Sequence, residues 1–159
     1  VLRGYRGGDL PAHTRVAPIE CPFTGEELAA VPAHRPDVGI VHAQRADRRG
    51  NVQLWGILGV QKEVVLAAAR SIVTVEEVVD ELEPRPGAIV LPSWTLDAVA
   101  LAPGGAHPSY AHGYYDRDNA AYLEWEKISR DRETFTAWLR DLEKNEPEKG
   151  EPAAERGAP

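Results

Sequence analysis

The sequence contains no methionine and a single cysteine among its 159 residues. One cysteine cannot form a disulfide within the chain, which is typical of a reducing compartment and predicts a cytoplasmic location. Cys21 stands between Glu20 and Pro22 with no obvious base beside it, so we expect an inert or structural thiol and not a nucleophile. Because the chain begins at Val1 and lacks methionine, we expect it to be processed or to be part of a longer polypeptide.

Long apolar runs and basic clusters are also missing. No run approaches the ~18 residues that a membrane-spanning helix needs, and we expect no signal peptide. The net charge of −7 and the lack of a basic stripe argue against a nucleic-acid backbone as the main partner. The hydrophobic share of 43% still supplies a core for one domain, because a chain of this size buries roughly 70% of the surface that its unfolded form exposes.

Apolar segments predict elements in the order strand, helix, strand, strand, strand, helix, helix, which is typical of an α/β fold. The clearest strands are residues 38–43, whose uninterrupted apolar start suggests a strand covered on both faces, and the β-branched run 71–79. Further predicted elements are a hairpin with its turn at 23–26, a short strand at 52–55, a helix at 60–70, two short strands at 88–92 and 95–102, and two helices capped by Asp116 or Asp118 and by Asp131.

The two last helices are expected to share an apolar stripe of Tyr122, Trp125, Ile128, Phe135, Leu139 and Leu142. We expect a loop over residues 1–15, one domain over residues 1–144 and a disordered acidic tail over residues 145–159.

The segment PDVGIVHAQRADRRGN, residues 36–51, changes from apolar to polar within a few residues. Because side chains alternate along a strand, His42 and Gln44 are expected on one face, at the carboxyl end of the strand. Ligands bind outside the carboxyl ends of strands in open α/β sheets, so these residues would line a binding crevice, beside a turn over residues 47–51. The alternative is a hydrogen-bonded histidine that closes the core, beside a self-bonded turn.

Two adjacent carboxylates, Glu76 and Glu77, suggest acid–base chemistry. Consecutive residues of a strand point to opposite faces, so the two cannot act as one pair. A single glutamate at the end of a buried strand is a candidate nucleophile. We favour a structural role, in which the carboxylate accepts backbone hydrogen bonds or pairs with an arginine.

The glycine-rich segment 103–118 contains His107 and His112. Zinc needs three or four ligands in fixed geometry, and Pro108 breaks any helix between the two histidines, so we expect no metal site. A loop that lines a pocket fits the composition better. Gly56 and Gly59 precede a predicted helix, but GILG matches no phosphate-binding motif.

Four segments occur in order along the chain: CPFTGEELAAVPA, PDVGIVHAQRADRRGN, SIVTVEEVVDE and APGGAHPSYAHGYYDRD. Together they resemble the A (alpha) subunit of class I CoA-transferases, the glutaconate and 3-oxoacid CoA-transferase family. The resemblance covers residues 21–142. The A subunit of that family is about twice this length and has a glycine-rich loop near its start that has no counterpart here. Residues 1–144 are therefore expected to form the carboxy-terminal part of such a subunit.

The resemblance implies an open, mostly parallel sheet flanked by helices, as part of a larger subunit. It implies an enzyme that moves CoA between carboxylic acids, with coenzyme A as substrate and without a permanently bound cofactor or metal. In this family the B subunit supplies a glutamate that attacks the acyl-CoA and then carries CoA as a thioester, so we expect no catalytic residue in this chain. The expected partner is the B (beta) subunit, in a hetero-oligomer, and neither nucleic acid nor a membrane is expected.

Five residues within the matching segments are expected near the substrate or the subunit interface: His42, Gln44, Asp47, Asn51 and His107. Two other functions remain open. Relatives of this fold hydrolyse or cleave CoA thioesters, including ring-opening steps, with the same subunit pairing. A chain of this architecture can also be a non-catalytic ligand-binding module, although no DNA-binding segment is visible.

Overall fold

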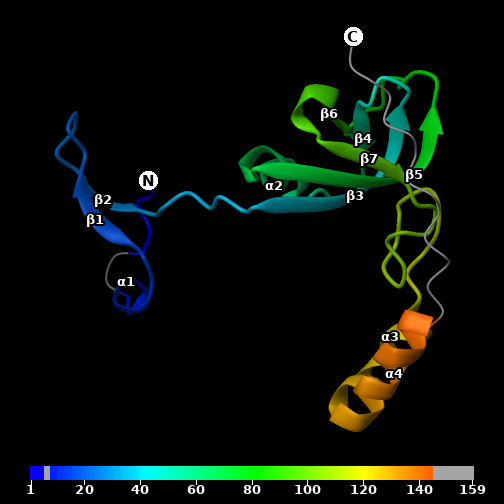
Figure 1. The fold of residues 1–159 in the computed structure, drawn as a ribbon. Coiled ribbons are helices and arrows are strands. Elements are labelled where there is room, and N and C mark those ends of the chain that lie inside the picture. The colour runs from blue at the N-terminus through cyan, green and yellow to red at the C-terminus, as the bar shows by residue number, and fades with distance from the viewer. Residues whose placement is uncertain (6–7, 145–159) are drawn as a thin grey trace. The chain divides into compact units, whose positions relative to one another are not determined.

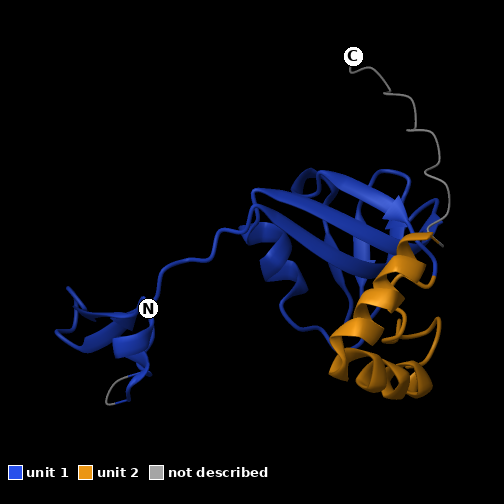
Figure 2. Cartoon of the chain, turned by 60° about the horizontal axis from the view of Figure 1, so that its bottom comes forward, with its two compact units in different colours: residues 1–103 blue, residues 104–159 orange. Residues whose placement is uncertain are grey.

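The computed structural model describes residues 1–5 and 8–144. The chain divides into two compact units, residues 1–103 and residues 104–159 (Figure 2). The acidic tail expected at 145–159 lies outside the described residues. Within the described part of the chain, no helix is long and apolar enough to cross a membrane.

The first unit begins with a two-stranded hairpin. Strand β1, Ala17–Glu20, pairs antiparallel with β2, Glu27–Ala30, which confirms the predicted hairpin. The turn between them is closed by the Cys21 N–H, which donates to the Glu26 carbonyl at 2.8 Å. A hydrogen bond with Thr24 lowers the pKa of the Cys21 thiol.

The prediction of a plain loop over residues 1–15 was wrong in two places. Helix α1, Leu10–His13, forms a single turn that has a proline at its start. Leu2 exchanges two backbone hydrogen bonds with Ala29 of β2, each 2.8 Å long. The pairing of Leu2 with a residue far along the chain leaves no local pattern in the sequence, which is why the sequence did not predict it.

A five-stranded sheet follows the hairpin in the first unit, in the order β6-β4-β3-β5-β7 (Figure 1). Its strands are β3, Val38–Asp47; β4, Val52–Leu54; β5, Arg70–Val79; β6, Ile89–Leu91; and β7, Ala98–Leu101. Strands β3, β5 and β7 are mutually parallel, whereas β4 is antiparallel to β3 and β6 is antiparallel to β4. The expected α/β fold with a mostly parallel sheet is therefore confirmed.

Helix α2, Gln61–Ala67, connects β4 to β5 and packs closely on β3. Gly39 permits this approach, because a Cβ atom at that position would lie only 3.0 Å from Val64 Cγ1 and from the Val64 carbonyl oxygen. The buried core around this contact consists of Val41, Ala43, Ala46, Val52, Leu54, Val65, Val73, Val75 and Leu91. A short 3-10 helix, η1, Ser93–Thr95, joins β6 to β7.

The opposite face of the central strands is open, so the expectation that β3 is covered on both faces was wrong for the described residues. Val38 is 46% exposed and Ile40 is 69% exposed, whereas Val41 is only 5% exposed. Ile40 is in register with Ile72 of β5, which in turn is in register with Ala98 of β7, and these two residues are also exposed. We call this apolar surface, made of Val38, Ile40, Ile72, Ala98 and Ala100, the open face.

The second unit contains a loop followed by two helices, α3, Asn119–Arg130, and α4, Arg132–Lys144. Asp118 caps α3, because its carboxylate accepts a hydrogen bond from the Ala121 N–H at 2.9 Å. Asp131 accepts from the Thr134 N–H at 2.7 Å at the start of α4. Both helices and the caps at Asp118 and Asp131 are confirmed.

The apolar stripe that the sequence predicted for the two helices is only partly buried. Trp125 contacts both Phe135 and Trp138, with ring centroids 5.9 Å and 4.9 Å apart. Trp138 was missing from the predicted stripe, and Leu142 is 52% exposed. Among the described residues of the two helices, none is fully buried.

Candidate functional site

His42 is held by two side chains of the neighbouring strand β5. Its Nε2 atom lies 2.5 Å from Glu76 Oε1, and its Nδ1 atom lies 2.8 Å from Thr74 Oγ1. The Glu76 side chain is only 3% exposed, and that of His42 is 16% exposed. Both ring nitrogens are therefore occupied by groups of this chain. We call these three residues the His42 array.

The position of His42 along the strand differs from the prediction. Strand β3 continues to Asp47, four residues beyond the predicted end, because residues 45–47 pair with residues 77–79 of β5. His42 and Gln44 consequently lie in the middle of the strand and not at its carboxyl end. The argument that placed them beside a crevice at the strand end was wrong. His42 shares the open face instead, because it alternates with Val41 and follows Ile40 by two residues.

Gln44 is buried and bonds to the backbone of Trp55. Its Nε2 donates to the Trp55 carbonyl at 3.1 Å, and its Oε1 accepts from the Trp55 N–H at 3.2 Å. The side-chain amide thus behaves like an additional backbone group that ties β3 to the end of β4. Such paired bonds satisfy a buried polar side chain.

Asp47 and Asn51 close the turn between β3 and β4. Asp47 Oδ1 accepts from the Arg49 and Asn51 N–H groups, both at 2.9 Å, and Oδ2 accepts from Asn51 Nδ2 at 2.8 Å. Burial raises the pKa of Asp47, but hydrogen bonds from the side chain and backbone of Asn51 and from Arg49 outweigh it, so the pKa lies below its usual value. Asn51 Oδ1 also accepts from the Ser93 N–H at 3.0 Å. The turn is therefore self-bonded, as one of the two alternatives for this segment predicted.

Glu77 turns away from Glu76, as strand parity predicts. It pairs with Arg45, and the Arg45 guanidinium also lies over the Trp55 ring, 5.5 Å from the ring centroid. Arg85 lies over the same ring at 4.2 Å. The two adjacent carboxylates are therefore engaged in separate pairs. Glu77 pairs with an arginine, as the structural alternative predicted, whereas Glu76 contacts a histidine, which the sequence did not predict.

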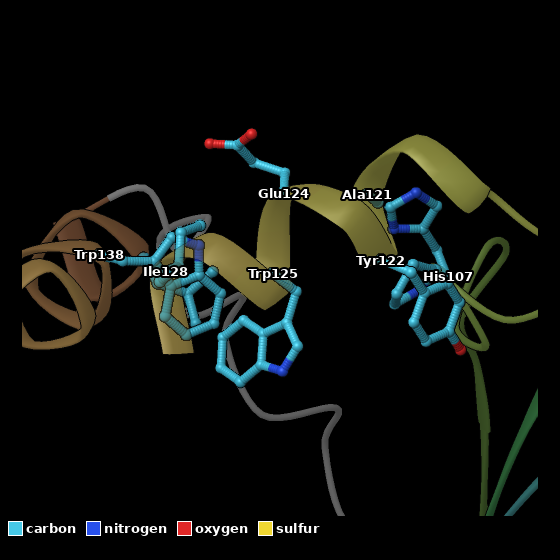
Figure 3. A pocket seen from close by; sticks show the side chains of 9 residues that line it. His107, Ala121, Tyr122, Glu124, Trp125, Ile128 and Trp138 are labelled. Carbon is cyan, nitrogen blue, oxygen red and sulfur yellow. The ribbon is translucent and has the colours of Figure 1, made fainter. Parts of the chain in front are cut away.

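His107 lies in the second unit, beside a pocket of about 660 Å³. The pocket is lined by His107, Pro108, Ala121, Tyr122, Glu124, Trp125, Ile128, Trp138 and Leu142. Most of these lining residues are aromatic or aliphatic. Figure 3 shows the Glu124 carboxylate on the opposite side of α3 from the Trp125 ring. His107 Nε2 lies 3.2 Å from Asp118 Oδ2. Hydrogen bonds from the Ala121 backbone and from His107 lower the pKa of Asp118.

Of the five site residues predicted from the sequence, the structure joins Asp47 and Asn51 by a hydrogen bond. Asp47 and Asn51 lie together in one turn, while Gln44 and His42 contact different partners. Thr74 and Glu76 were not among the five, although they are the residues that contact His42. Their alternation on β5 was visible in the sequence, but the register that places them opposite His42 was not. Among the described residues, no group of three or more His, Cys, Asp or Glu side chains could hold a metal ion.

The fold and several relatives define the class of protein. The family model described as "Coenzyme A transferase" matches residues 14–102. The chain is 64% identical over 140 residues to the A subunit of the 3-oxoadipate CoA-transferase of Pseudomonas knackmussii, and the match covers 87% of this chain and 50% of that protein. It is 41% identical over 131 residues to the A subunit of the glutaconate CoA-transferase of Acidaminococcus fermentans, and this match covers 78% of this chain and 41% of that protein.

A solved structure agrees with these sequence similarities. The crystal structure of glutaconate coenzyme A-transferase from Acidaminococcus fermentans superposes with a TM-score of 0.72 and 38% identity, over 80% of this chain and 41% of that one. The chain belongs to the coenzyme A transferase family, and these two relatives are both A subunits. It spans about half the length of the curated relatives it matches.

Proposed function

We propose that this chain is the carboxy-terminal part of the A subunit of a class I CoA-transferase. The observation that carries the proposal is the 64% identity over 140 residues to a CoA-transferase A subunit. The superposition on a solved CoA-transferase, with a TM-score of 0.72, also supports it. The chain would pair with a B subunit in a hetero-oligomer, in a reducing cytoplasm.

The reaction would transfer CoA from an acyl-CoA to a free carboxylic acid. The B subunit supplies a glutamate that attacks the thioester carbonyl and releases the CoA thiolate, which then attacks the resulting anhydride to form a glutamyl-CoA thioester and the free acid. The second acid reverses these steps and leaves with CoA. No permanently bound cofactor takes part. The names of the two relatives contain 3-oxoadipate and glutaconate, which are both dicarboxylic acids, and 3-oxoadipate is the first acid to test.

Within this scheme, the chain would contribute binding and not the nucleophile. Glu76 and Glu77 are already engaged by His42 and Arg45, and neither lies in the motif that carries the family's nucleophile. In the first unit, His42 is a proposed substrate-binding side chain, supported by the open face beside it. In the second unit, His107 is a proposed substrate-binding side chain, supported by the pocket that it lines. Gln44, Asp47 and Asn51 would act near His42 or at the subunit interface by holding the β3–β4 corner in shape.

The test is a reconstitution. The complete A subunit that contains this chain is co-purified with its B subunit, and the complex is given 3-oxoadipate and succinyl-CoA. We expect formation of 3-oxoadipyl-CoA with loss of an equal amount of succinyl-CoA. Release of free CoA without acyl exchange would instead identify a thioester hydrolase. Binding of ligand without turnover by an intact A/B complex would identify a non-catalytic module.

A further inference from the structure

The central strand β3 is paired along its whole length on one side only. On that side it forms a parallel ladder with β5 that extends from Val38 to Asp47. On the other side, β4 is in register with only Arg45 and Ala46 of β3. Within the described part of the chain, residues 38–42 therefore have a neighbouring strand on one side and none on the other.

The backbone groups of this segment alternate between the two sides of the strand. The Arg70 N–H of β5 donates to the Asp37 carbonyl at 3.1 Å, so the backbone of Asp37 faces β5. Successive residues direct their N–H and C=O groups to opposite sides within a sheet, so those of Val38, Ile40 and His42 face away from β5. Among the residues that the structure describes, no backbone hydrogen bond outside the strand ladders involves these three. We call this side of residues 38–42 the free edge.

The free edge has none of the features that protect the edge of a sheet. Natural edge strands are short, or carry charged residues or proline, because exposed backbone groups pair with other strands. The outermost strands of this sheet, β6 and β7, are three and four residues long. In contrast, β3 has ten residues, and its first five are Val-Gly-Ile-Val-His, without proline or a permanently charged side chain. A segment of this kind suits the addition of a further strand.

The length of the relatives indicates where such a strand comes from. The match to the 3-oxoadipate CoA-transferase A subunit covers 87% of this chain but only 50% of that protein, so about as much polypeptide again lies outside this chain. A strand of the same polypeptide pairs at the cost of closing a loop, which grows only slowly with loop length. A strand from another molecule also loses translational and rotational freedom. The same subunit is therefore the favoured source.

Resting on the proposed function, we propose that the free edge of β3 binds a strand from the remaining half of the A subunit. The backbone N–H and C=O groups of Val38, Ile40 and His42 pair with that strand, so residues 38–42 are paired on both sides in the complete subunit. The pairing uses the backbone and leaves the contact between the His42 ring and Glu76 in place. The free edge thus joins the two halves of the subunit and does not bind the substrate.

Hydrogen–deuterium exchange of single backbone amides tests this pairing. It is measured by mass spectrometry with electron-transfer fragmentation on the complete A subunit, on the A/B complex and on this chain. In the complete A subunit we expect the Ile40 and His42 amides to exchange about 100-fold or more slowly than in this chain, because a hydrogen-bonded amide exchanges only when the strand opens. The Gly39 and Val41 amides face β5 and serve as the internal control, against which the protection of Ile40 is compared within the complete A subunit.

Two substitutions of Ile40 provide a second test in the complete A subunit. Ile40→Pro removes one N–H of the free edge but no hydrogen bond to β5, because this N–H faces away from β5. We expect Ile40→Pro to speed the exchange of the His42 amide by about 10-fold or more, since the pairing beside it is lost. Ile40→Val keeps the N–H and suits a strand, so it should leave the exchange of His42 unchanged. Circular dichroism verifies that both variants fold.

Three results would overturn the proposal. Rapid exchange of the Ile40 and His42 amides in both the complete A subunit and the A/B complex would show that no strand binds. Protection that appears only in the A/B complex would assign the strand to the B subunit. Protection in this chain that equals that of the complete A subunit and rises with concentration would assign it to a second copy. Acyl exchange by the A/B enzyme would leave the proposed function standing in each case, whereas protected amides in a complex without acyl exchange would refute the proposed function alone.

Discussion

Glu76 and Glu77 are consecutive in β5, yet their carboxylates contact different residues of β3. Glu76 lies against His42, whereas Glu77 pairs with Arg45, three residues further along β3. The alternation of side chains along a strand separates the two carboxylates, so they do not form an acid–base pair. Neither is available as the nucleophile of the proposed reaction.

This separation leads to a chemical test. The isolated chain should show no CoA-transferase activity, because the proposed nucleophile lies in the B subunit. When the chain is incubated with an acyl-CoA and digested, mass spectrometry should find both glutamates unmodified. A CoA thioester on either Glu76 or Glu77 would place the nucleophile in this chain and contradict the proposed division of labour.

His42 and Val41 differ in orientation and should differ in the effect of substitution. In the complete A/B enzyme, His42→Ala is expected to lower kcat/KM while the fold remains intact, because the ring lies on the open face and not in the core. Val41→Asp should reduce the free energy of unfolding by several kcal/mol, because it places an unpaired charge in the core. Steady-state kinetics and urea unfolding measure the two effects. If His42→Ala unfolds the protein as severely as Val41→Asp, His42 is a core histidine.

Gly39 should be intolerant of even one added methyl group. In Gly39→Ala the new Cβ would meet Val64 at 3.0 Å and the Ala68 Cβ at 3.1 Å. Because part of this contact is with backbone, α2 must shift away from β3, at a cost of about 1–3 kcal/mol. Gly4→Ala is the control, since nothing lies within 4 Å of that position. Equal unfolding midpoints for the two variants would show that α2 does not pack closely on β3.

Asp47 should make the stability of the chain sensitive to acid. Its pKa is lower in the folded state than the ordinary value of 3.8. The stabilisation is therefore fully present above about pH 4 and is lost as the pH falls through the lower folded pKa. Asp47→Asn is expected to destabilise the protein at neutral pH by about 1–2 kcal/mol, because an amide replaces an acceptor that serves Asn51 Nδ2. Urea unfolding between pH 2 and 7 should show a smaller loss of stability in acid for the variant than for the parent.

The open face should make the isolated chain self-associate. Parallel sheets are normally covered on both faces, and exposed apolar patches promote association. Ile40→Gln should therefore lower the associated fraction in sedimentation velocity. Val60→Gln is a matched control, because Val60 is 68% exposed, almost the same as Ile40 at 69%, but lies outside the open face. A strictly monomeric parent chain with a cooperative melt would argue against this role of the open face.

The sequence by itself determined the type and order of the main elements. The β-branched run at 71–79 became β5, and the two acidic caps, Asp118 and Asp131, began α3 and α4. Strand parity correctly separated Glu76 from Glu77. The family resemblance was likewise present in short motifs. These features are local, because propensity, capping and alternation depend on residues within one or two turns of the chain.

Only the tertiary structure decided where β3 ends and what His42 contacts. Residues 45–47 are polar or small, and they became strand because β5 pairs with them over their whole length. The same register placed Thr74 and Glu76 against His42, 32 and 34 residues further along the chain. Register between distant strands is fixed by hydrogen bonds and packing that no local pattern encodes. The exposure of Val38 and Ile40 was also decided by the tertiary structure. An apolar side chain in the sequence indicates that burial is favourable, but it does not indicate which surface will cover it.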